Sequence, residues 1–215
     1  MQIDLNTSVS CVDGPFGELA SVVIDPGSRR VTHVVLQPHH HVDGARLMPV
    51  RSARSGEGPG AISLTCTVAT IGESESIQQS AYVRRGELID PGPGWDVGLQ
   101  ETYGMSVPSS VGPEILGAGV AMQYDEHVGV MYHRIPKGTV EIRGASPVTS
   151  SECDHLGHVV GMVIDETEQI TRLMFEHGHL WGKRIVDVPG VAIGRLQTDE
   201  VVLTLSSDEI GKLGS

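Results

Sequence analysis

The sequence predicts an all-β protein made of two small β-barrels that arose by internal duplication. Three observations predict this class. The chain has 215 residues, of which 27 are glycine and 12 are proline, and this turn-rich composition favours short strands over long helices. Apolar, β-branched residues fill short runs between turn signals, and two long segments of the chain resemble each other.

An internal repeat organises the chain. Residues 16–25 align with residues 156–165, and Gly17 and Gly157 occupy equal positions in the two segments. The similarity continues into the following strands with small shifts that fall at turns. Because self-similarity over this length indicates a repeated structural unit, the sequence predicts two copies of one fold.

The repeat divides the chain into three parts. The first copy occupies residues 1–80 and the second residues 145–215, with a glycine- and proline-rich connector over residues 81–144. Aromatic residues make up only 4% of the chain, so each core must be aliphatic. Since a barrel of about 70 residues has a small core, we expect the copies to pack face to face as a pseudo-dimer.

Each copy is predicted to contain four or more short strands and one helical turn. Asp25 and Asp165 follow the first apolar run of each copy, where their side chains would bond to the backbone of a tight turn. A capping-box spacing predicts helix starts at residues 70–73 and 206–209. The other predicted strands are residues 30–36, 46–50 and 61–68 in the first copy and residues 184–188 and 201–205 in the second.

The connector is too long to lack structure of its own. Two alternating runs, residues 128–135 and 139–143, flank a turn signal at residues 136–138, and this pattern predicts a β-hairpin. The hairpin would either add a strand pair to the second barrel or clip the two barrels together.

Several short motifs point to a known domain. They are Gly17, residues 23–25 and residues 46–50 in the first copy, and residues 163–165 with the run GHLWGK at residues 178–183 in the second. This pattern resembles the PRC-barrel, a small β-barrel named for the H subunit of the photosynthetic reaction centre. The same domain forms the C-terminal half of the ribosome maturation factor RimM.

The resemblance implies a docking role rather than an activity. PRC-barrels mostly hold a partner protein or stabilise an assembly, and the fold carries no shared catalytic residues. Fold analogy alone cannot supply an activity. The sequence also lacks a G-x-S-x-G nucleophile elbow, so we expect no enzyme and no catalytic residue.

Histidine-rich loops are the chemical peculiarity of the sequence. His39 and His41 stand near Asp43, and His177 and His179 stand in the corresponding loop of the second copy. In an extended backbone, residues two apart share a face, so each pair could present two imidazoles to a divalent metal. The plainer interpretation is exposed histidines bonded to backbone or water, with no cofactor.

Four residues are candidates for contact with a protein partner. They are Arg46, Arg184, His179 and Trp181. The two arginines are interpreted as repeating at equal positions, and arginine and tryptophan are enriched at the centres of interfaces. The plainer interpretation pairs an arginine with Asp187 or Glu176 at the barrel rim, and uses Trp181 to cover a barrel end.

Charge and composition limit the partners. The net charge of −12 argues against direct contact with nucleic acid, which needs a positive surface. No apolar run approaches the roughly 18 residues of a membrane span, so we expect no membrane insertion. The start shows no secretory signal, and three cysteines without paired spacing fit a reducing, cytoplasmic compartment.

The sequence thus predicts a non-enzymatic adapter of tandem PRC-barrels that binds another protein of unknown identity. Two alternatives stay open at this point. The first is a metal- or pH-responsive protein that uses the histidine loops, since imidazole titrates near neutrality. The second is a factor linked to ribosome assembly, which would contact a basic ribosomal protein. Homo-oligomerisation is compatible with each of the three.

Overall fold

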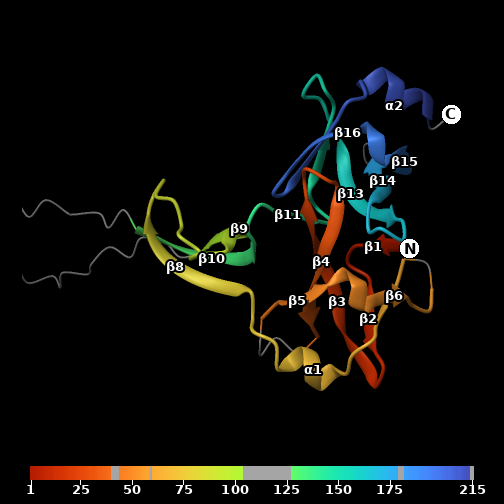
Figure 1. Ribbon diagram of the computed structural model, residues 1–215. Coiled ribbons are helices and arrows are strands. Elements are labelled where there is room, and N and C mark those ends of the chain that lie inside the picture. Colours follow the sequence, from red (N-terminus) through yellow and green to blue (C-terminus); the bar gives the residue numbers. More distant parts are fainter. Residues whose placement is uncertain (40–43, 59, 104–126, 179–181, 214–215) are drawn as a thin grey trace, which may run out of the picture.

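The structure is a computed structural model that describes residues 1–39, 44–58, 60–103, 127–178 and 182–213. In this part of the chain, β-strands form three sheets and only two short α-helices are present (Figure 1). This composition confirms the predicted all-β class. The first sheet consists of β2 (Ser8–Cys11), β3 (Gly14–Asp25), β4 (Arg30–Pro38), β5 (Arg46–Pro49), β6 (Ala53–Ser55), β7 (Ile62–Leu64) and β11 (Val140–Arg143).

The second sheet lies beside the first in the body of the molecule. Its strands run in the order β15–β14–β13–β12–β17–β16, and those of the first run in the order β5–β4–β3–β2–β7–β6. A single 3-10 turn follows β5 at Val50–Ser52 and β15 at Gly190–Ala192. The strands of the second sheet are β1 (Gln2–Asp4), β12 (Pro147–Thr149), β13 (His155–Ile164), β14 (Ile170–His177), β15 (Arg184–Pro189), β16 (Ile193–Gln197) and β17 (Glu200–Leu203).

The glycines that align in the sequence meet the same steric constraint in the two sheets. A Cβ atom on Gly17 would lie 2.0 Å from the carbonyl oxygen of Gln37. A Cβ atom on Gly157 would lie 1.8 Å from the carbonyl oxygen of Glu176. No side chain fits at such distances, so both positions require glycine because a neighbouring strand approaches closely.

Each sheet receives one strand from the other half of the sequence. β1 pairs with β13, with Ile3 opposite Met162, whereas the next strand along the chain, β2, belongs to the first sheet. In the reverse sense, β11 pairs with β3, with Ile142 opposite Val22, whereas the next strand, β12, belongs to the second sheet. The predicted boundaries at residues 80 and 145 therefore do not separate the two sheets.

Two turns add a second set of reciprocal contacts between the sheets. The N–H of Val31 donates to the carbonyl of Glu168 at 3.0 Å, and the N–H of Ile170 donates to the carbonyl of Arg29 at 3.0 Å. Buried residues of both sheets, among them Leu19 and Phe175, belong to one hydrophobic core, which is predominantly aliphatic as predicted. The two sheets therefore share their interior.

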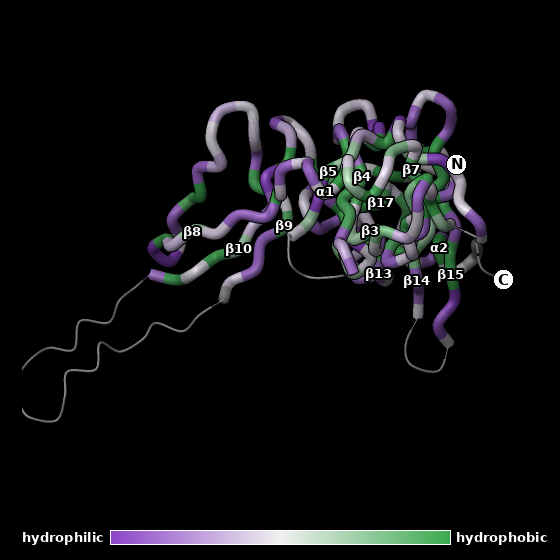
Figure 2. The backbone as a smooth tube through the Cα atoms, turned by 90° about the horizontal axis from the view of Figure 1, so that it is seen from below, coloured by the Kyte–Doolittle hydropathy of each residue, from purple (hydrophilic) through white to green (hydrophobic). Residues whose placement is uncertain are grey.

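The third sheet projects from the body. It is formed by β8 (Gln78–Arg84), β10 (His127–Pro136) and β9 (Trp95–Tyr103), in that order, with β10 in the centre. Figure 2 shows hydrophobic segments gathered in the body, whereas hydrophilic stretches are frequent along the projecting sheet. The sheet is antiparallel throughout.

The predicted hairpin between residues 128–135 and 139–143 is wrong. Both strands form, as β10 and β11, and the turn after Pro136 is present, since the N–H of Thr139 donates to the Pro136 carbonyl at 3.2 Å. However, β8 and β9 already occupy both edges of β10. The chain therefore leaves this sheet after the turn, and β11 pairs with β3 in the body.

One of the two predicted helix starts is correct. The backbone N–H of Ser206 donates to the Glu209 carboxyl at 2.9 Å, which is the expected capping box of α2 (Ser207–Leu213). At residues 70–73 the prediction is wrong, because α1 (Val68–Gly72) begins earlier. Thr67 caps it by accepting the N–H of Thr70 at 3.2 Å, and Glu73 stands at the opposite end.

The exchanged strands predict matched losses of stability. Ile3 and Ile142 are both fully buried in the shared core. Replacing either with alanine should lower the free energy of unfolding by about 2–5 kcal/mol, because each change leaves a cavity. Urea unfolding followed by circular dichroism measures this loss. Gln2→Ala, at an exposed neighbouring site, is the control and should change stability by less than about 0.5 kcal/mol. A loss below about 1 kcal/mol for either isoleucine would contradict the exchange.

Candidate functional site

The structure describes only part of the predicted histidine loops. His41, Asp43 and His179 lie outside the described residues. His39 is exposed at the end of β4, and Nδ1 of His177 bonds to the Leu156 carbonyl at 2.6 Å. Within the described ranges, no three His, Cys, Asp or Glu side chains gather closely enough to hold a metal ion.

The two arginines do not occupy equal positions. Pro49 lies opposite His33 on β4, and Pro189 lies opposite Arg172 on β14, so the two prolines correspond. Arg46 lies three residues before its proline, as Val186 does in the second sheet. Arg184 lies five residues before its proline and therefore corresponds to Gly44. The predicted alignment is thus wrong by two residues.

The surroundings of the arginines also differ from the prediction. Arg46 is buried, with 6% of its surface exposed, so its side chain is not on the surface of this structure. Arg184 is half-buried and donates to the Gly211 carbonyl in α2 at 3.4 Å. The predicted acidic partners are paired with other cations, Asp187 with Arg172 and Glu176 with Lys183, each at 2.7 Å. Trp181 lies outside the described residues.

The turn aspartates have the predicted role. Asp25 accepts the hydroxyl of Ser28 and the N–H of Gly27, and Asp165 accepts groups of Thr167 and Gln169. These hydrogen bonds hold the pKa of both carboxyls below the ordinary aspartate value. Both residues therefore shape turns rather than a reaction centre.

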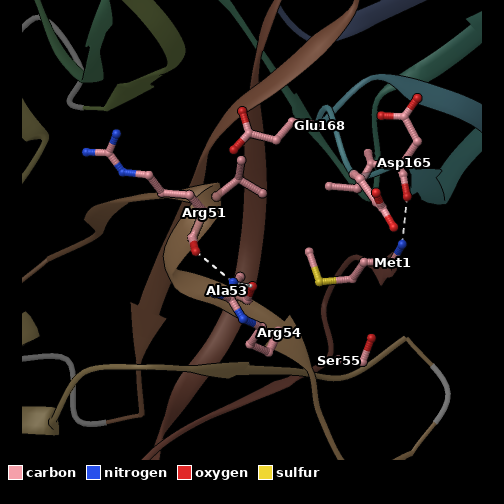
Figure 3. Close-up of a pocket in the computed structure, with 10 residues that line it drawn as sticks. Met1, Arg51, Ala53, Arg54, Ser55, Asp165 and Glu168 are labelled. Carbon is pink, nitrogen blue, oxygen red and sulfur yellow. Dashed lines mark hydrogen bonds between the residues drawn. The ribbon is translucent and has the colours of Figure 1, made fainter.

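A pocket of about 610 Å³ opens between the two sheets (Figure 3). Arg51 and Arg54 lie on the wall from the first sheet, and Asp165 and Glu168 lie on the wall from the second. The Arg54 guanidinium already donates to the carbonyls of Arg51 and Ala53 at 2.7 and 2.8 Å. In Figure 3 the Arg51 guanidinium points away from Asp165. The polar groups of this pocket do not converge on a common point.

A second polar cluster lies where the third sheet meets the body. Its centre is Glu141 on β11, which is fully buried. One carboxyl oxygen accepts the hydroxyl of Ser21 on β3 and lies 2.8 Å from Nδ1 of His133 on β10. The other oxygen accepts the backbone N–H of Leu99 on β9 at 2.8 Å. One side chain thus joins β3 and β11 of the first sheet to two strands of the third.

The backbone leaves room for this carboxyl group at Gly98. A Cβ atom there would lie 2.2 Å from the second oxygen of Glu141 and 2.9 Å from Cγ2 of Ile135. The cluster is not a nucleophilic triad, because the Ser21 hydroxyl is buried and donates to the central acid instead of to a base. Its chemistry therefore supports attachment of the third sheet, and no sequence spacing connects its members.

The end of the third sheet nearest the body covers part of the outer face of the first sheet. We call this the covered face, formed by Val23, Val35 and Ala45, which are all fully buried. Ile77, just before β8, and Ile135 of β10 pack on these residues and are almost fully buried themselves. The residues form a small apolar core outside the main one.

The equivalent face of the second sheet is open. Val163 and Met174 stand at the positions of Val23 and Val35, and both are half-buried. Ile185 stands at the position of Ala45, four residues before the shared proline, and 65% of its surface is exposed. We call this the open face, formed by Val163, Arg172, Met174, Glu176, Lys183, Ile185 and Asp187.

Comparison with known proteins adds no assignment. No protein-family model matches the sequence, and no curated protein matches it. Within the described ranges, no helix has the length and apolar character needed to cross a membrane.

The thiol of Cys11 is not activated. The pKa of the Cys11 thiol is raised to about 11, mainly by burial and to a smaller extent by the nearby Cys66 and Asp13. A thiol of this kind stays protonated at neutral pH, whereas a nucleophile needs the thiolate. All three cysteines are free in the structure.

Removing the central acid should loosen the third sheet. Glu141→Ala deprives Ser21, His133 and the Leu99 amide of a partner, which should cost about 2–4 kcal/mol of unfolding free energy. Hydrogen exchange should accelerate first in β9 and β10. The control is Glu101→Ala, at a side chain that is 72% exposed, which should cost less than about 1 kcal/mol. Equal losses for the two variants would contradict the attachment role.

The pH dependence of stability should include a contribution from His33. Burial and then the charge of Arg51 lower the pKa of His33 below its ordinary value of 6.5. The unfolded chain therefore binds this proton more tightly, so stability is complete above pH 6.5 and falls as the pH drops further. His33→Gln should show a smaller decrease in melting temperature between about pH 7.5 and pH 5.5 than the natural chain. An unchanged or larger decrease would contradict this assignment.

Proposed function

We propose that the chain is a non-enzymatic protein-interaction module built from two duplicated PRC-barrel-like units. The common strand order and the paired glycines Gly17 and Gly157 support the duplication. The motifs shared with PRC-barrels support the family and, through it, a docking role. On this proposal the two units form a pseudo-dimer within one chain, with exchanged strands as the link.

The difference between the covered and the open face carries the proposal. Two equivalent surfaces exist, and the chain buries only one of them with its own third sheet. On the other, Ile185 remains 65% exposed among paired charges. Aliphatic side chains surrounded by a polar rim are typical of protein-binding surfaces. A docked protein would thus replace the cover that the first sheet already has.

The polar clusters support an adapter rather than an enzyme. Glu141 is committed to attachment of the third sheet, and the Arg54 guanidinium in the pocket is occupied by backbone carbonyls. The net charge of −12 favours a protein over a nucleic acid as the partner. Free cysteines favour the cytoplasm in this proposal.

The test is capture of bound proteins with matched surface variants. The natural chain, Ile185→Glu and Val191→Glu would be used as affinity baits under gentle conditions. Val191 is 78% exposed in the 3-10 turn after β15 and lies outside the open face, so it is the control. Ile185→Glu should reduce the bound proteins about tenfold or more, and the control should retain them. Equal capture by all three baits would contradict the proposal.

A further inference from the structure

The open face has an ordered arrangement of charge along β14. Leu173 and Phe175 point into the core, so Arg172, Met174 and Glu176 share the outer face. Met174 is thus flanked by a cation on one side and an acid on the other. The side chains of Arg172 and Glu176 are 55% and 37% exposed, so both can be reached from solvent.

The neighbouring strand repeats this arrangement. Val186 and Val188 are buried, so Ile185 and Asp187 face outward on β15, and Lys183 precedes them on the same face, where it contacts Glu176. Ile185 is therefore flanked by a cation and an acid in the same chain order as Met174. Because β14 and β15 are antiparallel, each end of the open face carries one positive and one negative charge.

We propose that the open face binds the open face of a second copy of this chain. This inference rests on the proposed function and names the partner of that surface. When two copies meet with their β14 strands antiparallel, the cationic end of each strand lies over the acidic end of the other. The aliphatic residues Met174 and Ile185 then meet in the centre, as in the packing of two β-sheets. The arrangement is isologous, as expected for a dimer with two-fold symmetry.

Charge also explains why a second copy would dock here and not elsewhere. A net charge of −12 makes two copies repel each other over most of their surfaces. The charged residues that define the open face balance, because Arg172 and Lys183 offset Glu176 and Asp187. One further acid, Asp4 on β1, lies at its edge beside Gly161. The open face is defined by seven residues, whereas each partner contributes roughly 20–30 residues to a standard interface, so we expect a weak, concentration-dependent dimer.

Sedimentation equilibrium of the full chain, from about 5 to 500 µM, tests the inference. The natural chain and Val191→Glu should both dimerise. Ile185→Glu and Met174→Glu should weaken association about tenfold or more, because each buries a charge in the apolar centre. Circular dichroism verifies that each variant remains folded, which the exposure of Ile185 favours.

A charge-swap experiment distinguishes a second copy from any other occupant. Variant one carries Arg172→Glu and Lys183→Glu, and variant two carries Glu176→Lys and Asp187→Lys. Each alone should associate less than the natural chain because like charges face each other, whereas an equimolar mixture should form mixed dimers. Mixed dimers support the inference. The inference is overturned if the equimolar mixture remains monomeric. It is also overturned if the natural chain dimerises and Ile185→Glu dimerises equally well.

The two proposals can fail separately. If the natural chain is monomeric at all concentrations but the Ile185→Glu bait loses bound proteins that Val191→Glu retains, the second-copy inference is overturned and the docking function stands. If the chain dimerises through the open face and none of the baits captures another protein, the second-copy inference is supported and the adapter role fails.

Discussion

The exchange of β1 and β11 between the two seven-stranded sheets is the constraint on which the rest of the structure depends. Ile3 on β1 enters the shared core from the second sheet, although the next strand, β2, belongs to the first. Ile142 on β11 enters it from the first sheet, although the next strand, β12, belongs to the second. The chain crosses between the sheets after β1 and again after β11. The turns near Arg29 and Glu168 also bond to each other, which links the two sheets a second time. The two halves therefore cannot separate without unpairing strands, so the outer faces keep fixed positions.

The same exchange accounts for the difference between the two outer faces. Glu141 on β11 lies opposite Val23 in the first sheet. Gln2 on β1 lies opposite Val163, which is the equivalent position of the second sheet. Glu141 reaches Ser21, whereas the residue that corresponds to Ser21 is Gly161, which has no hydroxyl group. Gln2 instead bonds to Asp4 at an exposed site. The residue at this strand position, Glu141 in the first sheet and Gln2 in the second, therefore differs in whether it can bond to the third sheet.

Local features of the fold were predictable from the sequence, and long-range pairings were not. The turn aspartates follow from motifs within a few residues. The alignment of Gly17 with Gly157 was also visible in the sequence, but the close approach of a neighbouring strand that explains it was not. The pairing of β11 with β3 could not be predicted in this way, because the alternation of apolar and polar residues in β11 fits a hairpin as well as an exchanged strand. The Arg46–Arg184 alignment failed because the loops before β5 and β15 differ in length, and identical residues hid the shift. The Glu141 cluster joins residues far apart in the sequence, so no motif predicts it.

The pairing of Ile3 with Met162 also has a consequence for synthesis of the chain. Translation delivers β1 before every strand of the first and third sheets, yet its partner β13 emerges only after all of them. Until then the first strand has an unsatisfied edge, and non-local pairing of this kind slows folding and exposes nascent chains to misassembly. Completion of the second sheet is thus a late event in folding.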